Sequence, residues 1–191
     1  AAPGSARFMR VATFNLSSQN DRMEDVAAFL AASDADVIVL EETTSAHLAE
    51  LRQALNSRYP HILGEWSIVI LSKHPIVAHG RSDPPGYPPW VSPMARWARI
   101  EVKGVAVEIV GVHLTRPFYP AGQDQDYAAL TAFVRSRDLP LVVAGDFNAT
   151  PWTVKFADLI RTTELARHNT LYPTWPTELL PHSSPASIPY R

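Results

Sequence analysis

Short apolar runs alternate with amphipathic stretches along the chain, a pattern typical of strands interleaved with helices. Apolar and alternating runs predict strands over residues 8–16, 37–40, 66–71, 76–78, 96–102, 105–112 and 141–144. Apolar residues at helical spacing predict helices after a capping box at 21–24, and over 45–57, 124–137 and 156–160. Prolines predict irregular chain over 81–93 and from 170 onward, and residues 1–7 are expected to be a flexible lead-in.

The order of these elements predicts the fold class. A hairpin about Lys103 and Gly104 stands beside strand–helix–strand spacings, which favours an α/β domain with mixed sheets. No internal repeat or linker interrupts the pattern. We therefore expect residues 1–191 to form one domain.

Composition narrows the functional classes. The 191 residues are 46% hydrophobic, carry a formal net charge of -2 and include no cysteine. Disulfides, zinc–thiolate sites and cysteine nucleophiles are thereby excluded. The charge disfavours a broad basic face for nucleic acid but allows a small site that reads one phosphate. No apolar run is as long as a membrane span, so no membrane segment is expected in this chain.

Polar side chains follow the ends of four predicted strands. Asn15 ends the first, Glu41 and Glu42 follow the second, and His113 follows the strand over 105–112. The stretch LVVAGDFN delivers Asp146 and Asn148. Sites in open α/β sheets lie beyond strand ends, and carboxylates with amides suit Mg²⁺. A histidine there can donate a proton or bind phosphate.

Each of these signals also has a purely structural interpretation. GDFN is a common turn sequence, and the two glutamates can begin the next helix. Asn15 can cap the loop that follows it, and His113 can be a core histidine. Taken one at a time, the motifs therefore do not decide between structure and catalysis.

The ordered set of motifs resembles the endonuclease/exonuclease/phosphatase superfamily. Asn15, DVIVLEE, ILSKHPI, GVHL and GDFN occur in the family's order, and the resemblance runs from about residue 11 to 175. Its members include DNase I-like nucleases, abasic-site endonucleases, inositol polyphosphate phosphatases and neutral sphingomyelinases. The resemblance implies two mixed β-sheets packed face to face with helices outside, a four-layer α/β/β/α sandwich. It also implies a phosphoesterase that depends on Mg²⁺ or Mn²⁺.

The resemblance assigns roles to five residues. Glu42 matches the metal-binding glutamate, and Asn15 matches the asparagine near the metal. His113 and Asn148 match residues that contact the phosphate, and Asp146 matches the residue that orients or deprotonates the attacking water. The family has glutamine where this chain has glutamate at position 41, and we expect this difference to add negative charge.

Arg116 is a further candidate because it lies in the stretch after His113, which is expected to border the cleft together with residues 81–93. A guanidinium at this position suits a phosphate contact.

The family pattern continues with IDH and SDH motifs that have no counterpart here, since the chain contains no Asp-His pair. We therefore expect a domain that is incomplete at its C-terminus, with C-terminal strands missing and little activity. An exposed sheet edge is expected to self-associate or to be covered by the chain's own tail. Thr174, Trp175 and Pro176 resemble a structural element of the family.

Two functional hypotheses remain at this point. The first is a metal-dependent enzyme that hydrolyses a phosphodiester or phosphomonoester of nucleic acid, lipid or a small molecule. The second is a non-catalytic binding or scaffolding module that keeps the fold. The sequence does not distinguish a cytoplasmic from an extracytoplasmic location.

Overall fold

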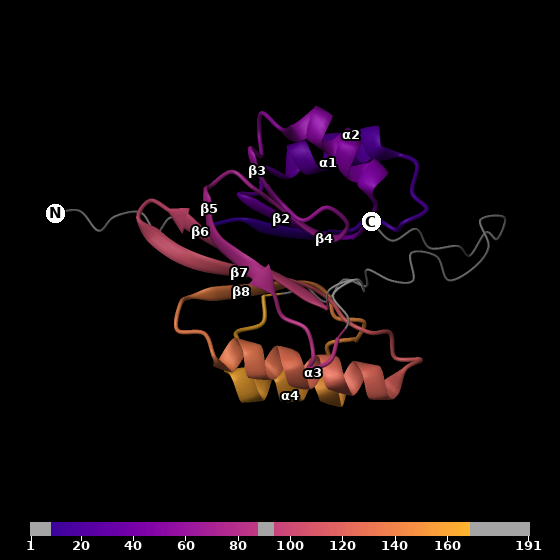
Figure 1. Cartoon of the computed structure of the whole chain (residues 1–191), viewed down its shortest axis with the longest axis vertical. Coiled ribbons are helices and arrows are strands. Elements are labelled where there is room, and N and C mark those ends of the chain that lie inside the picture. Colours follow the sequence, from indigo (N-terminus) through magenta and orange to yellow (C-terminus); the bar gives the residue numbers. More distant parts are fainter. Residues whose placement is uncertain (1–8, 88–93, 169–191) are drawn as a thin grey trace.

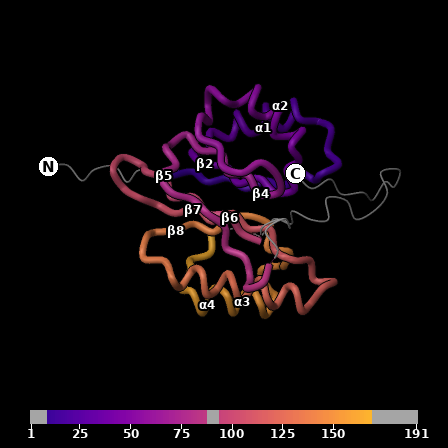
Figure 2. The backbone as a smooth tube through the Cα atoms, viewed as in Figure 1, coloured from indigo at the N-terminus to yellow at the C-terminus, as the bar shows by residue number. Residues whose placement is uncertain are grey.

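The computed structural model describes residues 9–87 and 94–168, which form two facing β-sheets with helices on both outer sides (Figure 1). The first half of the chain builds one sheet and its two helices, and the second half builds the other sheet and its pair (Figure 2). The predicted four-layer α/β/β/α sandwich is therefore confirmed.

The first sheet has the strand order β1-β2-β4-β3. Strands β1 and β2 are parallel, and β4 runs antiparallel to both β2 and β3. Its elements are β1 (Val11–Asn15), α1 (Met23–Ser33), β2 (Val37–Thr43), α2 (Ser45–Leu55), β3 (His61–Leu63) and β4 (Ser67–Ser72).

The second sheet has the order β5-β6-β7-β8. Strands β5, β6 and β7 are antiparallel, and β7 is parallel to β8. Its elements are β5 (Ile76–Arg81), β6 (Ala95–Val102), β7 (Val105–His113), α3 (Pro120–Arg135), β8 (Leu141–Asp146) and α4 (Val154–Thr163).

Three apolar clusters hold the four layers together. One joins α1 and α2 to the first sheet, one joins α3 and α4 to the second, and one fills the space between the sheets. Gly111 allows the sheets to approach closely, because a Cβ there would lie 2.8 Å from Val39 and 2.9 Å from Ile68. The sheets therefore meet tightly just below the end of β7.

Most predicted elements are confirmed, including the hairpin between β6 and β7. The capping box predicted at 21–24 is wrong: Arg22 precedes α1 and makes no side-chain cap. A capping box occurs instead at α2, where Thr44 and His47 exchange hydrogen bonds. Strand β3 was not predicted, because three half-buried residues give too short a pattern.

Several boundaries also differ. Helix α3 begins at Pro120 rather than at residue 124, since proline suits the first turn of a helix. Helix α4 extends beyond the predicted 156–160 at both ends. Predictions for residues 1–8, for 88–93 and for the chain after 168 lie outside the described residues. Among the helices of the described ranges, none has the length and apolarity to cross a membrane.

Candidate active site

The four polar strand ends meet at one edge of the sandwich. In the parallel pair β1–β2, Asn15 lies beside Glu41, and in the parallel pair β7–β8, His113 lies beside Asp146. Asn15 of β1 donates hydrogen bonds to Glu42 of β2 and to Asp146 of β8, so these strand ends lie at the same edge of the two facing sheets. The fold thus brings residues from four distant segments together.

Asn15 links the two sheets by hydrogen bonds at this edge. Its Nδ2 donates to Glu42 Oε1 at 3.1 Å and to Asp146 Oδ2 at 3.2 Å. Its Oδ1 accepts from the backbone N–H of Ser17 at 2.9 Å, which fixes the orientation of the amide. Asn15 therefore caps the loop that follows it and also bridges two carboxylates.

Glu42 lies at an irregularity in the register of β2, with a positive φ of 53°. Its side chain is 20% exposed and is surrounded by donors. Besides Asn15, the Ser18 N–H donates to Oε2 at 3.3 Å, Arg116 Nη2 lies 3.4 Å from Oε1, and His113 Nε2 lies 3.9 Å from Oε1. Burial raises the pKa of Glu42, but these hydrogen bonds and charges outweigh it and leave the pKa lowered.

Glu41 points into the protein and is 1% exposed. Burial, with a smaller contribution from the nearby Asp146, raises its pKa to about 8. The hydrogen bond that Thr13 Oγ1 donates at 2.8 Å lowers the pKa but does not offset the burial. At neutral pH Glu41 is therefore largely protonated. The expectation that it adds negative charge is wrong there, because a protonated carboxyl is a neutral group of glutamine's shape.

Gly145 turns the end of β8 so that Asp146 lies beside Asn15. Its φ is +139°, and a Cβ at this position would lie 2.1 Å from the carbonyl oxygen of Val112. Only glycine fits so close to β7. Asp146 Oδ1 then accepts from the Asn148 N–H at 2.8 Å, while Oδ2 faces Asn15.

Asn148 has a positive φ of 46° and is held from three sides. Its side-chain Nδ2 donates to the Leu114 carbonyl at 2.7 Å, and its backbone carbonyl accepts from Gln123 Nε2 at 2.9 Å. One N–H of the carboxamide is thus used within the protein, and the second is available to a ligand.

Phe147 anchors the turn that carries Asp146 and Asn148. Its ring packs edge-on against Phe156 with centroids 5.3 Å apart, and Tyr127 donates to its carbonyl at 3.1 Å. The loop after β7 is fixed in a similar way, because the Thr115 N–H donates to Asp126 Oδ2 at 2.7 Å.

Gln123, Asp126 and Tyr127 are buried polar residues on α3 that support the site and were not predicted. Asp126 and Tyr127 lie within the predicted helix. A polar residue on the buried face of that helix would have indicated a supporting role. Gln123 lay outside the predicted boundary of that helix.

The six predicted site residues therefore lie in one place. Asn15 bridges Glu42 and Asp146, His113 and Arg116 flank Glu42, and Asn148 adjoins Asp146. The side chain of Arg116 is 61% exposed, against 20% for that of Glu42, so its guanidinium is accessible to a ligand.

The residues fit Mg²⁺, which usually keeps several water ligands when it binds to a protein. No group of three or more acidic, histidine or cysteine side chains is arranged to hold a metal ion by itself among residues 9–87 and 94–168. Mg²⁺, however, is commonly held by one or two carboxylates plus substrate phosphate. Glu42 and Asp146, which converge on one amide group, supply such oxygen donors.

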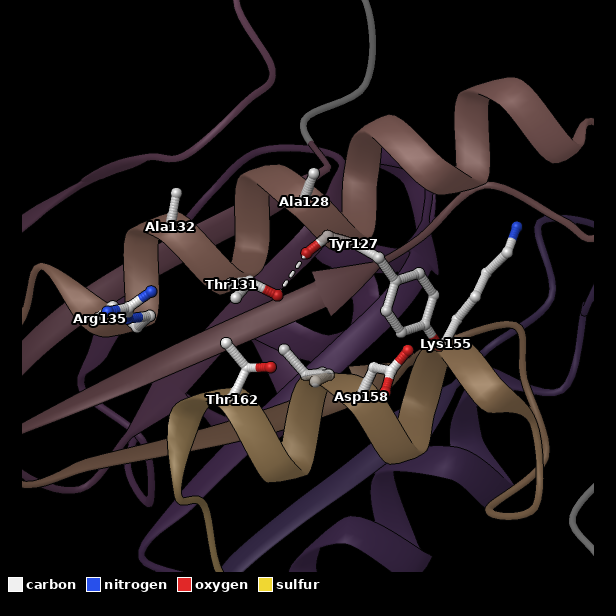
Figure 3. Close-up of a pocket in the computed structure, with 9 residues that line it drawn as sticks. Tyr127, Ala128, Thr131, Ala132, Arg135, Lys155, Asp158 and Thr162 are labelled. Atoms are coloured by element: carbon white, nitrogen blue, oxygen red, sulfur yellow. Dashed lines mark hydrogen bonds between the residues drawn. The ribbon is translucent and has the colours of Figure 1, made fainter.

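A groove elsewhere has no part in this arrangement. It lies between α3 and α4 on the outer side of the second sheet and is lined by Tyr127, Ala128, Thr131, Ala132, Arg135, Lys155, Asp158, Leu159 and Thr162 (Figure 3). None of the six site residues lines it.

Solved structures of known proteins share this fold. Beta toxin from Staphylococcus aureus, solved as a mutant with bound magnesium ions, superposes with a TM-score of 0.71 at 15% identity, covering 90% of this chain and 77% of that one. Sphingomyelinase C from Streptomyces griseocarneus gives 0.65 at 23% identity, covering 83% and 70%. Truncated TDP2 from Caenorhabditis elegans gives 0.62 at 18% identity, covering 74% and 62%.

Sequence comparison gives a more direct assignment. No curated protein matches the chain. Residues 12–186, however, match the Endonuclease/Exonuclease/phosphatase family, a span that contains all six site residues. With this match and the fold in agreement, the chain belongs to the Endonuclease/Exonuclease/phosphatase family of phosphoric-ester hydrolases.

Proposed function

We propose that this protein hydrolyses a phosphodiester or phosphomonoester with the help of Mg²⁺, which Mn²⁺ can replace. One observation carries the proposal: the Glu42 and Asp146 carboxylates, from different sheets, converge on the Asn15 amide group beside His113. Two carboxylates beside potentially cationic groups suit phosphate chemistry.

Glu42, with Asn15 beside it, is proposed to hold the metal. When bound, a divalent cation neutralises charge on the phosphate and on the leaving oxygen. Asn15 keeps the Glu42 carboxylate in place through Nδ2. The lowered pKa of Glu42 keeps it ionised, as a metal ligand must be.

Asp146 is proposed to orient the attacking water and to take its proton. Its Oδ1 is fixed by the Asn148 N–H and its Oδ2 by Asn15, so the carboxylate has a defined direction. Asn148 offers its second N–H to a phosphate oxygen, and His113 offers Nε2 from the neighbouring strand. Arg116 adds a guanidinium at the exposed side.

The substrate is proposed to be a compact phosphate ester. The net charge of -2 does not favour a long nucleic acid, although it allows one phosphate to be read. The similar folds of a sphingomyelinase and of TDP2 support phosphoester chemistry as the proposed activity.

Metal binding and turnover test the proposal separately. Mn²⁺ binding followed by electron paramagnetic resonance should be lost in Glu42→Ala and kept in Glu50→Ala, a change at an exposed glutamate on α2. Hydrolysis of bis-p-nitrophenyl phosphate should require Mg²⁺ and stop in Glu42→Ala. If the wild type neither binds Mn²⁺ nor hydrolyses the ester, the non-catalytic binding module is the correct alternative; if both properties are present and Glu42→Ala changes neither, Glu42 is not the metal ligand. The low activity expected from the missing SDH motif stays a prediction that the same assay measures.

A further inference from the structure

Lys155, in the first turn of α4, reaches across to α3 (Figure 3). Its Nζ donates to Gln123 Oε1 at 3.2 Å and to the Pro120 carbonyl at 3.4 Å, and it forms an ion pair with Asp124 Oδ1 at 2.7 Å. An ammonium group has three N–H donors. Three acceptors at the start of α3 therefore match the donors of this one side chain.

The position of Lys155 has an electrostatic cost. The first turn of a helix is the positive end of the helix dipole, where an anionic side chain is favoured and a cation is not. Lys155 lies in the first turn of α4 and also beside the start of α3, so it meets the positive ends of two helices. The side chain of Asp124 is 64% exposed, and ion pairs with such exposed groups stabilise little. The ion pair alone therefore does not explain why a lysine occupies this position.

Gln123 is the buried partner of Lys155. It is 5% exposed, and both ends of its carboxamide are engaged: Oε1 accepts from Lys155, and Nε2 donates to the backbone carbonyl of Asn148 at 2.9 Å. Turning the carboxamide over would place Oε1 against the Asn148 carbonyl and Nε2 against the ammonium, and both contacts would be repulsive. Lys155 and Asn148 thus fix one orientation of the carboxamide between them.

Without the ammonium, the Gln123 carboxamide would lose one of the two groups that orient it. Its Oε1 would lose an acceptor contact in a buried position, which is unfavourable, and the carboxamide would be free to turn. Asn148 would then lose the donor to its backbone carbonyl. Because Asn148 has a positive φ of 46°, its conformation depends on the surrounding hydrogen bonds. The contact made by Lys155 therefore bears on the geometry of the turn after β8.

We infer that Lys155 is a positioning residue for the proposed reaction. Its ammonium fixes the Gln123 carboxamide, and Gln123 in turn holds Asn148 so that the second side-chain N–H of Asn148 meets a phosphate oxygen. The inference rests on the proposed function and adds a residue of α4 to it. Lys155 acts through Gln123 rather than on the substrate, because its own donors are directed at acceptors of α3.

Two substitutions of Lys155 test this role in the hydrolysis of bis-p-nitrophenyl phosphate with Mg²⁺. Lys155→Met keeps an unbranched side chain and removes the donors. It should lower kcat about three- to tenfold, the scale of one lost hydrogen bond, and leave KM within about twofold of the wild type. Lys155→Arg keeps a cationic donor and should restore most of kcat. An unchanged kcat in Lys155→Met, or an effect on KM alone, would overturn the inference.

Asp124→Asn is the matched control. It removes the ion pair with Lys155 and leaves the hydrogen bond from Lys155 to Gln123. The variant should keep kcat within about twofold of the wild type, since exposed ion pairs contribute little. A loss equal to that of Lys155→Met would assign the effect to the ion pair and contradict the inference.

A double-mutant cycle distinguishes an effect through Gln123 from a direct effect of the lysine charge. If Lys155 acts through Gln123, Lys155→Met should cost nothing further in the Gln123→Ala background. If its charge acts on the phosphate directly, the two losses in kcat should multiply. Multiplied losses would refute the positioning role.

Hydrogen exchange tests the link without catalysis. The carboxamide protons of Gln123 are followed by ¹⁵N nuclear magnetic resonance in EDTA and are assigned by their loss in Gln123→Ala. Exchange should be slow in the wild type and in Lys155→Arg, and about three- to tenfold faster in Lys155→Met. Equal rates in these proteins would overturn the inference and leave the proposed hydrolysis untouched. The expected rates in a wild type without turnover would instead reject the proposed function alone.

Discussion

The carboxamide of Asn15 donates a hydrogen bond to the carboxylate of Asp146 across 131 positions of sequence, and so joins the end of β1 to the end of β8. The same Nδ2 donates to Glu42. One neutral amide thus holds two carboxylates from different sheets. Without it, two like charges would face each other with less compensation.

Asn15→Ala removes both hydrogen bonds and should reduce the free energy of unfolding by about 1–2 kcal/mol, since the site is partly exposed. Urea denaturation in EDTA measures this loss. Asn56→Ala, at an exposed asparagine after α2, serves as the control and should lie within about 0.5 kcal/mol of the wild type. Equal stabilities of the two variants would argue against the bridge.

Glu41 should make stability depend on pH. Its pKa is about 8 in the folded protein, against an ordinary value of 4.5. Below pH 4.5 both states are protonated and the contribution of this carboxyl is intact. As the pH rises from there to 8, the unfolded chain releases the proton while the folded protein retains it, so stability falls.

Glu41→Gln removes this dependence. The variant should match the wild type near pH 4.5 and exceed it by roughly 2–4 kcal/mol at pH 8.5, on the scale of about 1.36 kcal/mol per pKa unit. Urea denaturation across this pH range, with EDTA present, gives the difference. A constant difference between the two proteins at all pH values would show that Glu41 does not titrate in this way; Glu50→Gln is the exposed control.

Gly145→Ala should be strongly destabilising, by about 3 kcal/mol or more, because the new Cβ would collide with the Val112 carbonyl and the φ is positive. Gly104→Ala is the matched control. It also has a positive φ, of +81°, but faces open space and should cost only about 1 kcal/mol. Thermal and urea denaturation of the pair separate the collision from backbone strain, and similar losses would refute the close approach of β8 to β7.

Gln123→Ala tests the support that α3 gives to the proposed site. The substitution removes the donor to the Asn148 carbonyl and should lower kcat about tenfold by misplacing the carboxamide, with KM less affected. Gln125→Ala, an exposed neighbour on the same helix, should leave kcat unchanged. An increase in KM alone, with kcat preserved, would assign Gln123 to substrate binding rather than to positioning.

Much of the fold could be predicted from local patterns because its strands are long and apolar. The runs over 37–40 and 141–144 were both predicted as strands, and both continue to their polar ends; β2 is almost entirely buried, whereas every residue of β8 is only partly buried. Strand β3 was missed because pairing with β4, rather than its own three residues, makes it a strand. The helix start at Pro120 was missed because the apolar spacing begins later than the helix does.

The sequence predicted which residues form the candidate site but not how they are arranged. Six residues followed from strand ends, from motif order and from one basic residue after His113. The protonation of Glu41 was not predictable, because its pKa depends on burial by residues distant in sequence.

The sequence by itself determined where strands end in polar groups and in which order those groups occur along the chain. Hydrophobic periodicity is local, so it can be read without knowledge of distant contacts. Tertiary structure alone decided that Asn15 faces Asp146 and that burial raises the pKa of Glu41. These properties depend on the packing of two sheets against each other, and through-space distance and burial are not encoded in the spacing of residues along the chain.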